Sequence, residues 1–175
     1  MAGRGQQLSE TAPRRGTGSA RVLLIEAPYY EAVAAELAAG AIAELEAAGA
    51  TFERIAVPGA LEIPLALAQA VRAGLIPADA DHARFDGCVA LGCVIRGETS
   101  HYETVTTNAN YWLMEIAARH AVPLGNAILT VETEAQALER ARGGRRGKGA
   151  DAVRACLALI EHARTFAEER AKERA

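Results

Sequence analysis

One short stretch, Arg96 to Glu103 (RGETSHYE), combines a turn, a helix start and a histidine. Ser100 and Glu103 have the spacing of a capping box, which predicts a helix that begins at His101. The free backbone N–H groups around Thr99 and Ser100, together with the helix dipole, favour an anion at such a helix start, and phosphate is the anion most often found there. The stretch therefore predicts a phosphate site.

His101 would lie on the first turn of this helix. Because the helix dipole disfavours a positive charge there, the imidazole is expected to stay neutral at pH 7. A neutral imidazole beside a phosphate is suited to proton transfer. The simpler interpretation is a histidine that faces solvent near a helix cap, and the residues alone leave the two interpretations about equally supported.

A second candidate is the segment from Val57 to Pro64 (VPGALEIP), which also precedes a predicted helix. Glu62 would lie on the first helical turn, where a carboxylate is favoured by the dipole alone, and by itself this explanation is sufficient. The functional interpretation is that Glu62 and the backbone at Ala60 and Leu61 bind a polar ligand. Two more residues, Tyr29 and Tyr30, could stack on a flat ring or could serve a core or an interface.

A glycine-rich basic segment follows near the C-terminus and contains Arg140, Arg142, Arg145, Arg146 and Lys148. Its GKG sequence is faintly similar to a phosphate-binding loop, but it lacks that loop's spacing, its Ser or Thr and its preceding strand. The segment is interpreted either as a solvated basic loop or as an anion site formed by one or two members. Nucleic-acid binding is not supported, because no aromatic residues are interleaved and the net charge is −3.

These segments follow an alternation of apolar runs and helical patterns. Strands are predicted at 21–26, 51–57, 85–95 and 125–131, and helices at 30–48, 62–73, and from about 100, 133 and 149. The helix after 100 carries an apolar stripe of Val105, Ala109, Trp112, Leu113, Ile116 and Ala117, and Thr133 with Gln136 forms another capping-box pattern. Such alternation predicts a mostly parallel sheet with helices on both faces and with ligands bound beyond the carboxyl ends of its strands.

Composition limits the remaining possibilities. The 175 residues fit one domain, and half of them are hydrophobic. Three cysteines without a paired spacing predict reduced thiols and a cytoplasmic location, and four scattered histidines predict no metal. Residues 1–20 are expected to be a disordered tail, with an organellar targeting peptide as the minor alternative, and no apolar run has membrane-spanning length.

Four segments, VPGALEIPLA, ALGCVIRGETSHYETV, GNAILTVETEAQALERA and GKGADAVRACL, resemble in order and spacing the hallmark segments of the 6,7-dimethyl-8-ribityllumazine synthases. The resemblance covers about residues 21–166. It implies a flavodoxin-like, three-layer α/β/α domain over 21–175 with a mostly parallel four-stranded sheet. It also implies a homo-oligomer built from pentamers, with active sites between subunits. The net charge and the lack of a membrane-spanning run predict neither nucleic-acid nor membrane partners.

The resemblance further implies a reaction. The amine of 5-amino-6-(D-ribitylamino)uracil condenses with the ketone of 3,4-dihydroxy-2-butanone 4-phosphate, phosphate leaves, and the ring closes with loss of water. Because the substrate supplies its own amine, no cofactor or metal is expected. Holding the two reactants together can contribute up to ~7–11 kcal/mol of the acceleration.

Residue roles transfer position by position. The resemblance assigns proton transfer to His101 and stacking on the pyrimidine ring to Tyr29. The residues implied to hold the uracil edge and ribityl chain, with the strand end beside them, are Ala60, Leu61, Glu62, Cys93, Val94 and Ile95. Those implied to surround the phosphate are Glu98, Thr99, the adjacent Ser100, Arg140 and Lys148.

The sequence departs from the family pattern at four positions. Tyr29 replaces the commoner Phe and keeps the stacking ring, while Pro28 replaces a frequent Arg. Asn126 stands where many relatives carry an aromatic residue from the neighbouring subunit, and Gly147 where Asn often precedes the lysine. None of these changes removes a group that the chemistry demands. The competing hypotheses are a flavin or lumazine carrier without activity, a shell-forming protein, and an archaeal-type riboflavin synthase, which consumes lumazine.

Overall fold

The computed structural model describes residues 19–77, 79–80 and 82–174. The tail predicted for residues 1–20 therefore lies almost wholly outside the described residues. None of the helices in the described part is long and apolar enough to cross a membrane.

In the described part of the chain, four strands alternate with five α-helices. The strands are β1 (Arg21–Glu26), β2 (Thr51–Ala56), β3 (Gly87–Ile95) and β4 (Leu124–Val131). The helices are α1 (Glu31–Ala47), α2 (Glu62–Arg72), α3 (His101–Arg119), α4 (Glu134–Ala141) and α5 (Lys148–Glu173), with a short 3₁₀ turn at Gly144–Arg146. The sheet has the order β2-β1-β3-β4 and every pair is parallel, which confirms the predicted α/β class.

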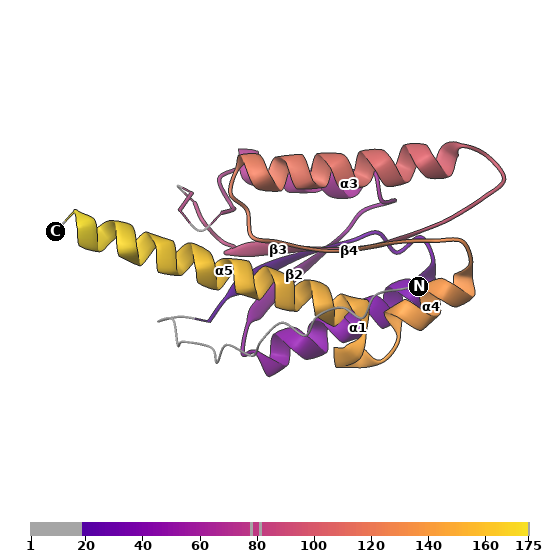
Figure 1. The fold of residues 1–175 in the computed structure, drawn as a ribbon, viewed down its shortest axis with the longest axis horizontal. Helices are drawn as coiled ribbons and strands as arrows, with labels where there is room; N and C mark the ends of the chain where they lie inside the picture. Colours follow the sequence, from indigo (N-terminus) through magenta and orange to yellow (C-terminus); the bar gives the residue numbers. More distant parts are fainter. Residues whose placement is uncertain (1–18, 78, 81, 175) are drawn as a thin grey trace, which may run out of the picture.

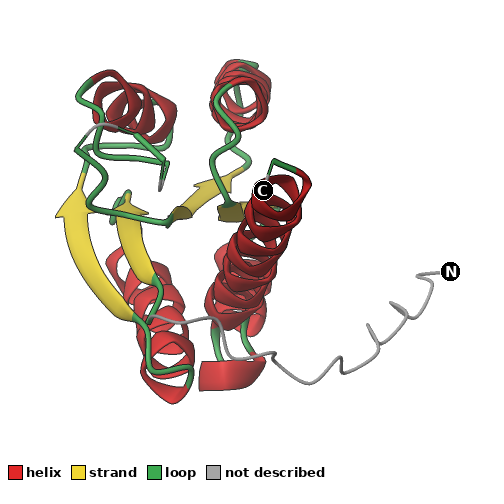
Figure 2. Ribbon diagram, turned by 90° about the vertical axis from the view of Figure 1, so that its left-hand side faces the viewer, coloured by secondary structure: helices red, strands yellow, loops and turns green. Residues whose placement is uncertain are grey.

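Helices cover both faces of this sheet (Figures 1 and 2). Helices α1, α4 and α5 lie on one face, and α2 and α3 lie on the other. Successive residues of β1 belong to the two different cores, since Leu24 is buried with the α1 and α5 side chains and Ile25 with those of α2 and α3. A strand buried on both faces needs the continuous apolar run that β1 shows.

The predicted elements agree with the observed ones to within two residues. The largest shift is at β3, which begins at Gly87 although the apolar pattern begins at Phe85. Asp86 accounts for the difference, because its carboxylate accepts a hydrogen bond from the Arg21 backbone N–H at 2.7 Å and also pairs with the Arg21 guanidinium. The chain is thereby held beside the amino end of β1 before the strand pairing of β3 begins.

The apolar stripe predicted on α3 is only partly correct. Ala109, Leu113 and Ala117 are buried, and Val105 and Ile116 pack against the same core. Trp112, however, is 50% exposed. Its position is 100° around the helix from Leu113, at the margin of the stripe, so the indole lies beside the core rather than in it.

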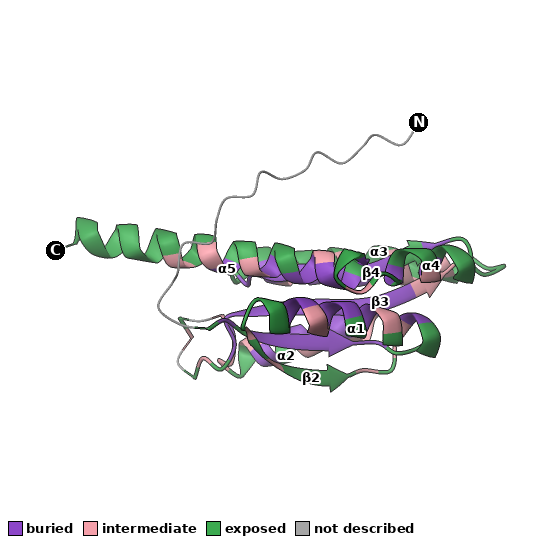
Figure 3. Ribbon diagram, turned by 90° about the horizontal axis from the view of Figure 1, so that it is seen from below, coloured by how far each residue is buried: buried purple, intermediate pink, exposed green. Residues whose placement is uncertain are grey.

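Strand β2 forms one edge of the sheet and is largely exposed (Figure 3). Large apolar side chains are also exposed on the two helices of one face, namely Leu65 on α2 with Tyr111, Trp112 and Met114 on α3. The folded chain thus buries two cores and leaves apolar surface on the α2–α3 side.

Helix α5 packs unusually closely against β4 and α1. A Cβ added to Gly125 would lie 1.9 Å from the carbonyl oxygen of Ala152, and one added to Gly149 would lie 2.0 Å from that of Leu37. Only a residue without a side chain permits these approaches, since the atoms it would meet belong to the backbone. The two glycines therefore set how near α5 comes to the sheet.

This packing leads to a stability prediction. Gly125→Ala forces α5 away from β4 and is expected to lower the free energy of unfolding by about 1–3 kcal/mol. Chemical denaturation at one fixed protein concentration measures the change. Gly97→Ala is the matched control, because nothing lies within 4 Å of a Cβ added there. Equal stability of the two variants would contradict the close packing of α5.

Candidate functional site

A cavity of about 400 Å³ opens at the carboxyl ends of β1, β2 and β3. In the sheet, β2 lies on one side of β1 and β3 on the other. The loops after β1 and β3 therefore lead to opposite faces of the sheet, and open parallel sheets bind ligands at such a point. We call this the first cavity. Its lining residues are Tyr29, Tyr30, Pro58, Gly59, Ala60, Leu61, Glu62, Cys93, Val94, Ile95, Gly97, Thr99, His101, Tyr102 and Val105.

Most of the predicted site residues meet in the first cavity. Each strand end contributes some of them: Tyr29 after β1, the segment 60–62 after β2, and the segment 93–95 at the end of β3. The start of α3 adds Thr99 and His101. The lining also contains Tyr102, which sequence reasoning missed, although an aromatic residue next to His101 on the first helical turn was a usable signal.

Two tyrosines form one wall of the first cavity. Tyr29 is 72% exposed, and its ring meets that of Tyr30 edge to face with centroids 5.1 Å apart. Burial raises the pKa of Tyr30 above its ordinary value. Tyr29 thus keeps an open ring face that a flat ligand can stack on, while Tyr30 supports it from the side.

Another part of the wall is the turn before α2. The backbone N–H of Glu62 donates to the carbonyl of Gly59 at 3.2 Å, and that of Ile63 donates to Ala60 at 3.3 Å. The Glu62 carboxylate lies back over this turn, since a Cβ added to Gly59 would be 3.1 Å from its Oε2. Glu62 therefore lies at the helix start that favours a carboxylate, and it faces the cavity.

Cys93 is the one thiol in the lining, and it is buried. Burial, with a smaller effect from Glu134, raises its pKa to about 11. Because the thiolate is the reactive form of cysteine, Cys93 is a neutral wall residue at physiological pH and not a nucleophile. Within the described residues, no group of three or more His, Cys, Asp or Glu side chains is arranged to hold a metal ion.

The turn before α3 differs from the prediction in its capping. Helix α3 does begin at His101, but the Ser100 side chain accepts no capping hydrogen bond. The Thr99 hydroxyl takes that place and accepts from the His101 backbone N–H at 3.4 Å. Glu103 does not complete the predicted capping box, and its carboxylate pairs with the Arg96 guanidinium, which carries a full positive charge.

The predicted phosphate cations lie elsewhere. Arg140 and Lys148 belong to a second cavity of about 590 Å³, beyond the carboxyl end of β4, which also includes Thr130, Val131, Glu132, Gln136, Glu139 and Arg146. Beside it, half of the predicted capping box forms, since the Gln136 N–H donates to the Thr133 hydroxyl at 3.3 Å. The Gln136 side chain accepts from the Glu132 N–H at 2.9 Å and not from that of Thr133. One chain thus places His101 and Arg140 in different cavities.

Three further predicted residues line neither cavity. Glu98 and Ser100 are exposed on the turn between β3 and α3. Asn126 is exposed on β4, where its amide N–H donates to Asn110 Oδ1 at 2.8 Å and its Oδ1 accepts from the Ile128 backbone N–H at 2.8 Å. These two bonds fix the orientation of the Asn126 amide against α3.

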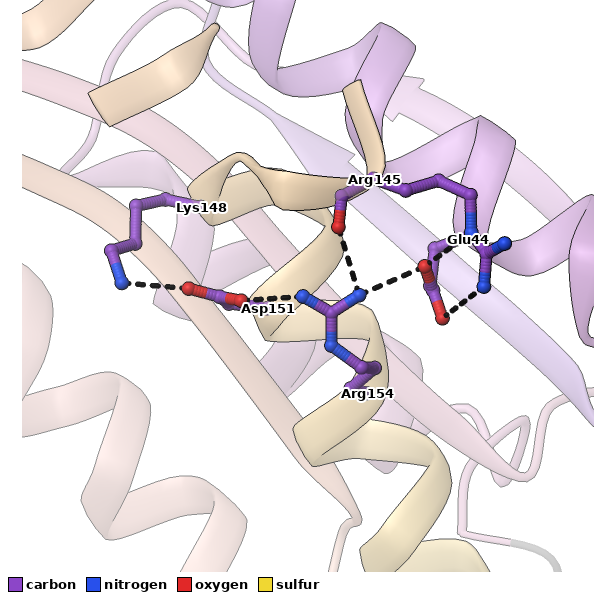
Figure 4. A network of polar contacts seen from close by, with 5 residues as sticks. All are labelled: Glu44, Arg145, Lys148, Asp151 and Arg154. Carbon is purple, nitrogen blue, oxygen red and sulfur yellow. Dashed lines mark hydrogen bonds and ion pairs between the residues drawn. The ribbon is translucent and has the colours of Figure 1, made fainter. Parts of the chain in front are cut away.

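A polar network distinguishes the cations of the basic segment from one another (Figure 4). Lys148 Nζ lies 2.6 Å from Asp151, and Asp151 in turn lies 2.6 Å from Arg154. Arg154 and Arg145 both pair with the buried carboxylate of Glu44, at 2.9 and 2.8 Å. The hydrogen bond from Arg145, assisted by the charge of Arg154, lowers the pKa of Glu44.

The remaining arginines of the segment differ in their partners. Arg142 lies 3.8 Å from Glu36. Among the described residues, Arg140 and Arg146 form no ion pair, and both line the second cavity. The anion-site interpretation of the basic segment therefore applies to Arg140 and Arg146, with Lys148 held nearby by Asp151.

Comparison with known proteins adds a sequence-wide likeness. A family model described as 6,7-dimethyl-8-ribityllumazine synthase matches residues 19–164. A protein of that name from Azorhizobium caulinodans is 57% identical over 141 residues, which cover 81% of this chain and 85% of the relative. Proteins of the same name from Beijerinckia indica and Methylocella silvestris are 50% and 52% identical, over 89% and 83% of this chain and 82% and 86% of their own lengths.

The Glu44 network leads to a prediction about pH. Because the pKa of Glu44 is lowered in the folded chain, its stabilisation is present above the unfolded-state pKa and is lost as the pH falls through the folded one. Glu44→Gln is expected to reduce the free energy of unfolding by about 1–2 kcal/mol at pH 7, a value discounted for the exposed arginines. Denaturation curves from pH 7 to pH 3 should show this difference shrinking below about pH 4. A difference that stays constant with pH would contradict the charged role of Glu44.

Proposed function

Because this chain belongs to the 6,7-dimethyl-8-ribityllumazine synthase family and has lumazine synthase activity in riboflavin biosynthesis, we propose that the first cavity holds the pyrimidine substrate and that His101 transfers protons there. The substrates are 5-amino-6-(D-ribitylamino)uracil and 3,4-dihydroxy-2-butanone 4-phosphate. The products are 6,7-dimethyl-8-ribityllumazine, phosphate and water. The observation that carries this proposal is the meeting of Tyr29, Glu62 and His101 in one cavity.

The pyrimidine fits the chemistry of the first cavity. Its flat ring stacks on the open face of Tyr29, and its polar edge binds the turn at Ala60 and Leu61 and the backbone at the end of β3. Glu62 accepts hydrogen bonds from the hydroxyl groups of the ribityl chain. The apolar side chains of Val94 and Val105 exclude water around the ring, which strengthens these hydrogen bonds.

His101 supplies the proton transfers. Attack of the substrate amine on the ketone carbon releases a proton from nitrogen, and the loss of water that follows needs a proton on the departing oxygen. An imidazole that accepts the proton from the amine nitrogen and donates it to the departing oxygen serves both steps. Thr99 and the N–H groups at the start of α3 hold the phosphate close to this histidine.

We infer further that the active site is shared between copies of the chain in a homo-oligomer built from pentamers. The separation of His101 and Arg140 into two cavities supports this arrangement, because the second cavity of one copy can complete the first cavity of the next. The exposed apolar side chains of α2 and α3, together with Ile55 on the β2 edge, supply a surface for such contacts. A location in the cytoplasm and the absence of a cofactor are also proposed.

The role of His101 leads to a prediction about turnover. His101→Ala is expected to slow lumazine formation about 10²- to 10⁴-fold, because it removes the proton-transfer group and leaves the cavity otherwise intact. Product fluorescence measures the rate against the uncatalysed background. His120→Ala is the matched control, since His120 caps the far end of the same helix.

Two outcomes would contradict the proposed function. If His101→Ala kept the wild-type rate, the histidine would have no part in proton transfer. If the wild type formed no product above background yet bound lumazine or riboflavin tightly, the chain would be a carrier. Offering lumazine alone and following its consumption would detect riboflavin synthase chemistry instead.

The shared site leads to a prediction about mixed oligomers. Arg140→Ala is expected to raise KM for the butanone phosphate ~10- to 100-fold, since a charge-assisted hydrogen bond contributes about 1.5–3 kcal/mol. Arg142→Ala is the control, because Arg142 pairs with Glu36 outside the cavity. When His101→Ala and Arg140→Ala chains are unfolded, mixed equally and refolded, about a quarter of the sites should regain both groups. Activity equal to the average of the two separate variants would contradict the shared site.

A further inference from the structure

We propose that Arg96 is a positioning residue that holds the phosphate turn of residues 97–100 and neutralises Glu132 in the second cavity. Arg96 is not itself among the residues that line either cavity. The inference deepens the proposed function and rests on it.

Arg96, which directly follows β3, contacts the start of α3 and the end of β4. Its guanidinium pairs with Glu103 on the first turn of α3, and its Nε lies 2.8 Å from the Glu132 carboxylate after β4. The same group lies over the Tyr102 ring, 4.1 Å from its centroid, a favourable cation–π distance. The Arg96 backbone N–H also donates to the carbonyl of Val131 at 2.9 Å. One residue therefore joins the ends of β3 and β4 to the start of α3.

The phosphate turn has little else to hold it. Residues 97–100 are exposed, and a Cβ added to Gly97 would meet nothing within 4 Å. Two hydrogen bonds around the turn are long: 3.4 Å from the His101 N–H to the Thr99 hydroxyl, and 3.3 Å from the Thr104 N–H to the Ser100 carbonyl. Arg96 precedes the turn and Glu103 follows it. Their ion pair therefore joins the two ends of the turn and fixes where Thr99 and His101 lie.

The second part of the inference concerns charge. Glu132 lies in the cavity that contains Arg140, Arg146 and Lys148, and a free carboxylate there repels any anion that these cations attract. The Glu132 side chain is 57% exposed, and its carboxylate pairs with Arg96 Nε at 2.8 Å. The Arg96 guanidinium compensates its charge without occupying the cavity.

A purely structural role for Arg96 predicts a different result. The Arg96 side chain is 40% exposed, and exposed ion pairs contribute little to global stability. Loss of Arg96 should therefore leave the thermal midpoint nearly unchanged. Its effect should appear in KM for the butanone phosphate, because the turn and the second cavity are the parts of the site proposed to hold the phosphate, and in kcat, because the same turn positions His101.

The experiment compares Arg96→Ala, Arg96→Lys and a matched control. Arg96→Ala is expected to raise KM for the butanone phosphate on the order of tenfold or more, with KM for the pyrimidine and the thermal midpoint close to wild type. Arg96→Lys should have a KM for the butanone phosphate between those of wild type and Arg96→Ala, since one ammonium cannot hold both carboxylates in fixed geometry. Arg84→Ala should change neither KM, although Arg84 likewise pairs with a carboxylate, Glu53, and lies over a ring, Phe85.

A second variant tests the charge. Inorganic phosphate, used as a competitive inhibitor and in direct calorimetric titration, should bind more weakly to Arg96→Ala than to wild type. Adding Glu132→Gln to Arg96→Ala should restore part of that affinity, because it removes the uncompensated carboxylate. Unchanged phosphate affinity in Arg96→Ala, or no recovery in the double variant, would overturn the corresponding part of the inference.

The outcomes separate this inference from the proposed function. A wild type that makes lumazine and binds phosphate, together with an Arg96→Ala variant that matches it, overturns the inference and leaves the function standing. A wild type that neither makes lumazine nor binds phosphate overturns both. An equal rise of both KM values with a lowered thermal midpoint shows that Arg96 only stabilises the fold.

Discussion

The parallel pairing of β1 with β3 at the centre of the sheet is the constraint on which the rest of the structure depends. From β1 the chain moves outward to β2 over one face, and it then crosses back over the other face to β3. Because such crossovers are right-handed, the change of direction places α1 on one face and α2 and α3 on the other. The loops after β1 and β3 must therefore separate, and the first cavity lies in that gap.

The features that the sequence predicted best are those that depend on neighbouring residues in the chain. Alternating apolar runs located all four strands, and the strand ends located Tyr29, Glu62 and His101 in one cavity. Glu103 was wrongly predicted to cap the helix, because its carboxylate pairs with Arg96, seven residues away, which also pairs with Glu132 after another strand. Local spacing carries no information about that competition.

The basic segment shows the same limit more clearly. Its five cations are similar in sequence, and no local feature separates Arg145 from Arg146. The difference comes from Glu44 on α1, more than a hundred positions earlier in the chain, whose buried carboxylate needs a cation and takes Arg145. Burying that charge is favourable only with such pairing, so α1 determines which arginines remain for an anion.

The contacts that fold the chain differ in location from the residues of its proposed site. Both cores are buried within one copy, and the Gly125 and Gly149 contacts that bring α5 onto them are also internal. His101 and Arg140, by contrast, lie in different cavities, and the β3–α3 turn, part of which lines the first cavity, carries few bonds of its own. On the proposal of a shared site, a substitution at a subunit contact changes turnover with little effect on the fold of each copy. The Arg96–Glu103 ion pair is then important for turnover, because it sets the position of the β3–α3 turn at which the two cavities of the shared site would meet.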